Sequence, residues 1–223
     1  MHGNQFEWEI PHFRYWKLMR YAVTKLQPCS QGYRENEKLL WQYLEAGDYE
    51  TLSKNISRFA PLLNSTRDRF GQYVLHHACC LGLSPLVTLF LQYGANINAV
   101  DFEHFTPLTR SLRSGNFVLA KFLIEQGADI SIPNDVLYTP IHFVCRARTS
   151  NYEAQISVTK LLLRKNSDIN ALTERGHSPL HLALRENAHP ELVKLLLQNG
   201  ASPSVDGGNE FVYLSIQTIS DSM

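Results

Sequence analysis

Between residues 68 and 205, apolar residues recur three and four positions apart in four separate stretches. Spacing of this kind places apolar side chains on one broad stripe of an α-helix, which is typical of a helix covered by its neighbours. None of these helices could bury its stripe alone, so the pattern predicts that they stack on one another. The four apolar sets are Leu86, Val87, Leu89, Phe90 and Leu91; Val118, Leu119, Phe122, Leu123 and Ile124; Val158, Leu161, Leu162 and Leu163; and Leu192, Val193, Leu195, Leu196 and Leu197.

A short signature precedes each stretch, and a Gly-Ala-like sequence ends it. A proline in three of the signatures suits the first turn of a helix, where its missing N–H leaves no bond unmade. The Thr or Ser before that proline can cap the helix by accepting a bond from a free amide. Each unit therefore predicts a short helix, a turn, a second helix and a hairpin. The signatures are Tyr73-Val74-Leu75-His76, Thr106-Pro107-Leu108-Thr109, Thr139-Pro140-Ile141-His142 and Ser178-Pro179-Leu180-His181.

The signatures recur at a regular interval. Val74 and Pro107 are 33 residues apart, as are Pro107 and Pro140, while Pro140 and Pro179 are 39 apart. A 33-residue period combined with a Thr-Pro-Leu-His motif resembles the ankyrin repeat. The resemblance implies an all-α ankyrin-repeat solenoid of helix-turn-helix units with β-hairpin connections, spanning residues 67–205. Its four repeats would cover about 68–100, 101–133, 134–172 and 173–205.

Two departures from the repeat pattern predict local irregularity. His104 and Leu137 stand where the pattern has a hairpin glycine, which adopts positive φ most easily, so we expect these two hairpins to be distorted. The third repeat carries six extra residues between Arg146 and Ile156, which predicts a longer loop between its helices.

Both ends of the array depart from the pattern, and we expect atypical caps there. Residues 34–66 resemble a degenerate capping repeat, with a helix to Ala46, a break at Gly47-Asp48 and a second helix. Residues 1–33 include a basic amphipathic stretch that could cover the solenoid end, bind a partner groove or lie on an anionic membrane. Residues 206–223 could form a partial fifth repeat or a capping strand, and these alternatives stay open.

Composition narrows the class of partner. The chain is 44% hydrophobic and 19% charged, which is ordinary for a folded protein. Its 21 basic residues balance 21 acidic ones, so we expect no nucleic-acid binding driven by a general basic field. Four cysteines are too few for a disulfide-stapled module, and no run is apolar enough for a signal peptide or a membrane span. These features favour a cytoplasmic or nuclear protein.

No motif predicts catalysis, a cofactor or a metal site. His76, His77, Cys79 and Cys80 lie close in sequence, but on one short helix they point in several directions, whereas zinc needs converging ligands. The family resemblance implies instead that His76, His142 and His181 hydrogen-bond between hairpins and that Cys79 and Cys145 are buried. Paired catalytic carboxylates, phosphate-binding loops and nucleophile motifs are missing from the sequence. We therefore predict a protein without enzymatic activity.

Aligning the sequences of the four repeats identifies a candidate partner-binding surface. In this family the hairpin tips and first helices line a concave face, and here the tips carry aromatic residues of the kind that anchor interfaces. Three arginines occupy equivalent positions near the ends of first helices and suit an extended acidic or phosphorylated segment. The alternative is that they are solvated charges, partly neutralised by Glu103 and Glu186. The candidate residues are Phe70, Phe102, Phe105 and Tyr138 with Arg113, Arg146 and Arg185.

Two functional classes are compatible with these features. The first is a stand-alone adaptor or inhibitor that holds a segment of another protein in the groove. The second is the substrate-recognition subunit of an enzyme complex such as a ubiquitin ligase. The second class predicts a Leu-rich recruiting box after the repeats, for which the residues following Asp206 are too few.

Overall fold

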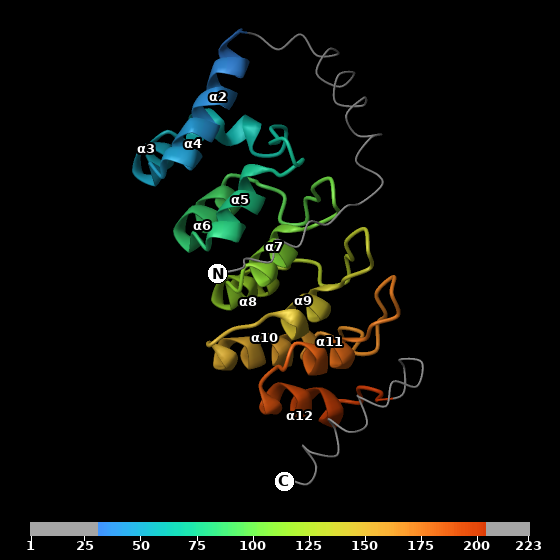
Figure 1. Cartoon of the computed structure of the whole chain (residues 1–223). Coiled ribbons are helices and arrows are strands. Elements are labelled where there is room, and N and C mark those ends of the chain that lie inside the picture. The colour runs from blue at the N-terminus through green and yellow to red at the C-terminus, as the bar shows by residue number, and fades with distance from the viewer. Residues whose placement is uncertain (1–30, 204–223) are drawn as a thin grey trace, which may run out of the picture.

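Stacked pairs of α-helices make up the computed structural model, which describes residues 31–203 (Figure 1). The predictions for the amphipathic stretch and for residues 206–223 lie outside this range. The fold is all-α, and residues 31–203 contain no strand and no helix with the length and apolarity of a membrane span. The four repeat pairs are α5 (Val74–Leu81) with α6 (Ser84–Gln92), α7 (Pro107–Arg113) with α8 (Phe117–Glu125), α9 (Pro140–Arg146) with α10 (Tyr152–Arg164), and α11 (Pro179–Arg185) with α12 (Pro190–Gln198).

Neighbouring repeats pack helix to helix. First helices α5, α7, α9 and α11 contact one another in order, as second helices α8, α10 and α12 do, and the first helices lie nearer the hairpins (Figure 1). The core passes without interruption from one repeat to the next, because equivalent apolar positions are buried in each. Burial also raises the pKa of the Cys79 and Cys145 thiols, which keeps both protonated and unreactive. The equivalent leucine or isoleucine of each first helix is almost fully buried: Leu75, Leu108, Ile141 and Leu180.

Hairpins connect the repeats and are tied to one another by single hydrogen bonds. Phe102 N–H donates to Phe70 O at 3.3 Å, and Glu174 N–H donates to Val136 O at 3.1 Å. One hydrogen bond between neighbouring hairpins is too few to form a sheet, so the connections in residues 31–203 are turns and not strands. Each hairpin also contains an internal bond, such as that from Asp101 N–H to Phe105 O at 3.1 Å.

The expected distortion of two hairpins was wrong. His104 and Leu137 adopt φ values of 58° and 61°, close to the 77° of Gly71 and the 76° of Gly176. Their hairpins keep the internal bonds of the glycine-containing ones, for instance from Leu137 N–H to Asn134 O at 3.0 Å. Hydrogen bonds to adjacent hairpins hold the backbone in this conformation. His104 and Leu137 therefore adopt positive φ despite the steric strain that their Cβ atoms cause.

This strain makes Leu137 a position where glycine should stabilise the protein. Leu137 is 49% exposed, so Leu137→Gly removes little packing. We expect the free energy of unfolding to rise by about 0.5–1 kcal/mol, because relief of left-handed strain exceeds the entropic cost of glycine. The measurement is urea unfolding followed by circular dichroism. Val136→Gly is the control and should lower stability, because Val136, directly before Leu137, is not among the positive-φ residues. Equal effects of both changes would contradict the argument.

The insertion in the third repeat lengthens a helix more than it lengthens a loop. Five residues, 147–151, separate α9 from α10, compared with three between α7 and α8. Helix α10 has 13 residues where α8 has 9, so most of the insertion forms an extra turn. Buried Gln155 in that turn donates from Nε2 to Val144 O at 2.7 Å and to Ala147 O at 3.1 Å. The turn is helical because this side chain satisfies the free carbonyls at the end of α9.

A less regular unit precedes the first full repeat. Helix α2 (Gln31–Ala46) ends where predicted, and Asp48 caps α3 (Tyr49–Lys54) by accepting a bond from Thr51 N–H at 3.0 Å. The predicted second helix is broken at Asn55 into α3 and α4 (Ile56–Phe59), followed by the 3₁₀ helix η1 (Ala60–Leu62). Leu52, Ile56 and Phe59 are nevertheless all buried, so the break does not interrupt the core.

Candidate partner-binding face

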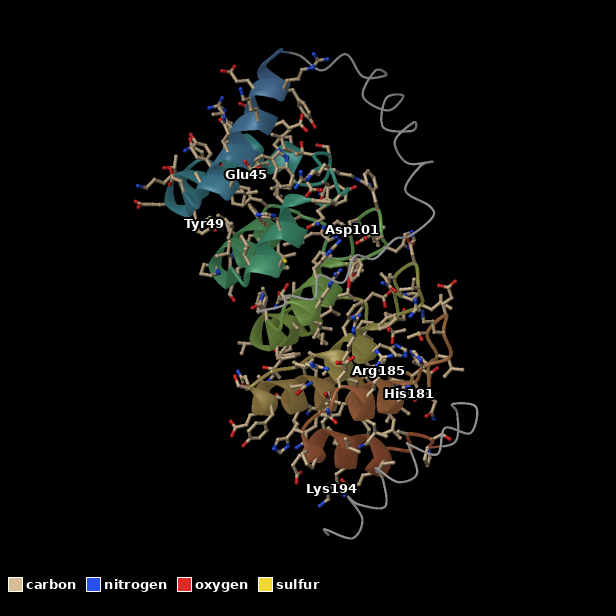
Figure 2. The ribbon with its side chains drawn as sticks, in the orientation of Figure 1. Glu45, Tyr49, Asp101, His181, Arg185 and Lys194 are labelled. Carbon is tan, nitrogen blue, oxygen red and sulfur yellow. The ribbon has the colours of Figure 1, made fainter. Side chains whose placement is uncertain are left out.

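The predicted arginines lie in register because their helices are equally long. Arg113, Arg146 and Arg185 are the last residues of seven-residue helices α7, α9 and α11. Asp101, His181 and Arg185 lie on the same side of the array in Figure 2, the side from which the hairpins project, and Tyr49 lies on the opposite side. We call the surface formed by the hairpins (68–72, 101–105, 134–138 and 173–177) and these three arginines the inner face.

Each of these arginines stands beside a ring from its own hairpin. Arg113 Cζ is 5.1 Å from the centroid of the Phe105 ring, and Arg146 Cζ is 5.8 Å from that of Tyr138. In the fourth repeat, Arg185 Nη1 is 3.5 Å from His177 Nδ1. Attraction between a guanidinium and a ring face limits side-chain motion. The two arginines over aromatic rings are therefore partly ordered before any partner arrives.

One of the four predicted aromatic anchors is not available to a partner. Phe70 is 48% exposed, whereas Phe105 is only 5% exposed. The prediction that Phe105 is an exposed anchor was therefore wrong. The Phe105 ring packs 5.3 Å from Phe143 and lies beneath Arg110, whose Cζ is 4.2 Å from the ring centroid. The buried Phe105 ring thus packs against the guanidinium groups of Arg110 and Arg113. Phe102 and Tyr138 are half-buried.

The pairing of arginines with rings extends to the first repeat, which sequence reasoning missed. Arg69 Cζ lies 4.8 Å from the Phe70 ring centroid, and Arg67 Cζ lies 5.8 Å from that of Phe102. The Phe102 ring in turn covers Gly71, where an added Cβ would come within 2.4 Å of ring carbon Cγ. Glycine at this point is what allows the ring of the second repeat to lie on the first hairpin.

A buried ion pair fixes the second hairpin. The Asp101 side chain is 0% exposed and accepts bonds from Arg110 Nε at 2.8 Å and Nη2 at 2.5 Å. Its other oxygen accepts from the amides of Glu103 and Phe105, at 2.9 and 3.0 Å. One carboxylate therefore holds the hairpin to α7 and sets the ring beneath Arg113.

Arg110 and Phe143 are two further residues that the sequence prediction omitted. They occupy equivalent positions in their repeats, directly after the four-residue signature. The same position is His77 in the first repeat and Leu182 in the fourth. Phe143 packs against both Phe105 and Tyr138, at 5.3 and 5.5 Å between centroids. The signal that could have identified them is the change of chemistry from repeat to repeat at a position facing the hairpins.

Positive charge on the inner face is concentrated in the second and third repeats. Glu186 lies 3.3 Å from Arg185 and 2.9 Å from Arg148, so it offsets both charges. Within residues 31–203, neither Arg113 nor Arg146 has a carboxylate within 4.0 Å. Burial, followed by the neighbouring charge of Arg110, lowers the pKa of Arg113. The sequence-based alternative of partly neutralised charges therefore describes Arg185, which Glu186 contacts. Glu103 pairs with Arg110 and also opposes the charge of Arg113, without forming an ion pair with Arg113.

Two buried histidines serve the structure. His76 Nε2 donates to Phe105 O at 2.9 Å and His142 Nε2 to Ala171 O at 3.0 Å, as the family resemblance implied. Each Nδ1 accepts from an amide at the start of its own helix, that of Tyr73 or Thr139. Burial lowers the pKa of both imidazoles, which favours the neutral form these bonds require. In the described part of the chain, no group of three or more His, Cys, Asp or Glu residues could hold a metal ion.

Comparison with known proteins agrees with this architecture. The family model described as ankyrin repeats (3 copies) matches residues 40–134 and 132–206. The Neurospora crassa protein named "Ankyrin repeat protein nuc-2" is 30% identical over 135 residues, which is 60% of this chain and 12% of that protein. Two relatives come from Arabidopsis thaliana. "E3 ubiquitin-protein ligase KEG" is 27% identical over 187 residues, covering 79% of this chain and 11% of its own length.

The second, "Putative E3 ubiquitin-protein ligase XBAT31", is 29% identical over 192 residues, covering 81% of this chain and 42% of its own length. This chain thus spans less than half the length of each of these three relatives. The family match covers most of the chain and coincides with the stacked helix pairs. The chain belongs to the ankyrin-repeat family.

Proposed function

We propose that this protein is a non-catalytic adaptor or inhibitor whose inner face binds an extended acidic or phosphorylated segment of another protein. Ankyrin repeats are protein–protein interaction modules, which supports the general class. The observation that carries the finer proposal is the pair Arg113 and Arg146, adjacent cations without carboxylate partners among residues 31–203. Two neighbouring like charges repel each other, and an anion from a partner relieves that repulsion.

The chemistry of the side chains favours carboxylate or phosphate. A guanidinium presents its donors in a planar fork that matches the oxygens of either group. Each arginine lies near the ring of Phe105 or Tyr138, and among residues 31–203 its fork forms no ion pair with a carboxylate. Less rotamer freedom is then lost when an anion binds, which improves affinity. The balanced charge of the whole chain makes the attraction local to this face.

The test is fluorescence polarisation with labelled twelve-residue peptides that alternate serine with glutamate, phosphoserine or lysine. We expect the two anionic peptides to bind and the lysine peptide not to bind. Arg113→Glu with Arg146→Glu should weaken anionic binding by about 10- to 100-fold at about 0.15 M salt, because two attractions become repulsions. The matched control is Lys160→Glu with Arg164→Glu, which makes the same charge change on exposed positions of α10.

The control variant should bind within about threefold of wild type, because its charges lie on α10 and not on the inner face, and salt at about 0.15 M screens exposed charges over about 8 Å. Equal losses in both double variants would mean that only net charge matters, and the inner face would not be the site. Circular dichroism of each variant must match wild type, since a loss of helicity would assign these arginines a structural role instead.

A second candidate function is substrate recognition within a ubiquitin ligase. It is favoured by one observation, that two relatives aligned over about four fifths of this chain are named as ubiquitin-protein ligases. Under this proposal the protein purified from cells carries ubiquitin-conjugating activity toward a reporter fused to the anionic peptide. Conjugation that disappears with the Arg113→Glu, Arg146→Glu variant would support it. A preparation that binds the reporter without attaching ubiquitin to it would contradict the ligase proposal and be consistent with the adaptor or inhibitor.

A further inference from the structure

Arg113 and Arg146, which have no carboxylate within 4.0 Å among residues 31–203, lie in adjacent repeats. Helices α7 and α9, which end at Arg113 and Arg146, pack directly against each other. Axes of packed helices lie about 8–10 Å apart. Because the arginines occupy the same position on parallel units of the array, their attachment points share this interval. A ligand that satisfies both must present anionic groups at a similar interval along one edge.

We infer that the inner face selects segments in which two anionic side chains stand three residues apart in a polyproline II conformation. This inference rests on the proposed function and specifies its ligand. One anion pairs with Arg113 and the other with Arg146. The two residues between them face away from the arginines, and proline suits these positions.

Backbone geometry separates this conformation from the other regular ones. Polyproline II has three residues per turn and rises about 3.1 Å per residue, so positions i and i+3 share one edge about 9 Å apart. In a β-strand, residues on one face are about 6.7 or 13 Å apart, which falls short of or beyond the interval. An α-helix matches it only between i and i+7, about 10.5 Å apart.

Ordering favours polyproline II over the helical alternative. A polyproline II ligand needs four ordered residues to span both arginines, whereas a helix needs eight, and each ordered residue costs backbone entropy. Polyproline II is already a major conformer of unfolded chains, and an isolated short helix must first form a costly nucleus. The segment that loses least entropy on binding is therefore the shorter one.

Charges around the two arginines restrict where anions can sit. The adjacent hairpins carry exposed carboxylates from Glu103, Asp135 and Glu174, which disfavour anions along the hairpin edge. In the fourth repeat, Glu186 already pairs with Arg185. A third anion three residues further along the ligand therefore meets a neutralised arginine and adds little. Removing the Glu186 charge should make the third position productive.

The experiment compares labelled peptides of equal charge by fluorescence polarisation with the full chain. One contains Glu-Pro-Pro-Glu, one contains Glu-Pro-Glu-Pro, and one is an alanine-rich helix with glutamates seven apart. We expect the first to bind at least about tenfold more tightly than the other two, since only it places both anions correctly without ordering a helix. Phosphoserine replacing both glutamates should follow the same spacing rule, and its relative affinity identifies the preferred anion.

Point variants connect the spacing preference to the two arginines. Arg113→Gln and Arg146→Gln should each remove most of the preference for three-residue spacing, whereas Arg164→Gln on α10 should leave it unchanged. Glu186→Gln should let a third glutamate, in Glu-Pro-Pro-Glu-Pro-Pro-Glu, tighten binding by about threefold or more, the worth of one exposed ion pair. In the wild type, the third glutamate should change affinity by less than about twofold.

The outcomes distinguish this inference from the function on which it rests. Equal affinity for two- and three-residue spacing would overturn the inference while leaving anion binding by the inner face intact. Tightest binding of the alanine-rich peptide would also overturn it, in favour of a helical ligand. If none of the anionic peptides bound, the proposed function itself would fall.

Discussion

Replacement of Asp101 by alanine should lower the free energy of unfolding by about 3–5 kcal/mol, the usual cost of removing one partner from a buried ion pair. The Asp101 side chain is fully buried and Arg110 is 11% exposed, so water cannot replace the lost carboxylate. The change also removes the acceptor for the amides of Glu103 and Phe105. Urea unfolding followed by circular dichroism measures the loss. The slope of the free energy of unfolding against urea concentration should stay unchanged, which checks that both proteins undergo the same transition.

Asp135→Ala is the matched control for this prediction. Asp135 occupies the next hairpin but is exposed, and its loss should change stability by less than about 0.5 kcal/mol. Asp101→Asn should lie between the two, because an amide oxygen still accepts from backbone N–H groups while the attraction to Arg110 is lost. If Asp101→Ala and Asp135→Ala cost the same, the buried pair is not what fixes this hairpin.

Replacement of Leu162 by alanine should lower the free energy of unfolding by about 2–5 kcal/mol. Leu162 is fully buried on α10, which contacts α8, α9 and α12. The lost methyl groups leave a cavity between repeats, and the surrounding helices cannot close it without disturbing the stack. Because repeats are stabilised by their neighbours, weakening one interface lowers the stability of the array. Urea unfolding measures this effect as well.

The adjacent residue provides the control for that change. Leu163 lies on the same helix and is half-buried, so Leu163→Ala deletes the same atoms from a less enclosed site. We expect a cost of about 1–2 kcal/mol, in line with the smaller area removed from water. A larger loss from Leu163→Ala than from Leu162→Ala would show that α10 packs in a different orientation from the one described.

Part of the inner face followed from the sequence, and part did not. Arg113, Arg146 and Arg185 could be placed in register because the repeat period fixes equivalent positions without knowledge of the fold's details. Their electrostatic difference could not, since it depends on which carboxylates reach them. Glu186 forms an ion pair with Arg185, while no carboxylate in the described part of the chain lies within 4.0 Å of Arg113 or Arg146.

Exposure of the aromatic residues also required the structure. Phe105 and Tyr138 occupy equivalent positions, yet Phe105 is buried and Tyr138 is half-buried. The difference arises because Asp101 draws Arg110 over the Phe105 ring, while Phe143 takes the equivalent place in the next repeat. A repeat pattern assigns a position, but the exposure of the residue there depends on side chains from neighbouring units.

The sequence by itself determined the helix pairs, their order and their stacking, because these follow from local periodicity, capping and a recurring interval. The tertiary structure alone decided the details that depend on contacts between repeats. His104 and Leu137 adopt positive φ because the hairpins on either side are bonded to theirs. The third-repeat insertion became a helical turn because Gln155 could reach the end of α9. Interactions between residues distant in sequence override local preference when they bury polar groups that must be satisfied.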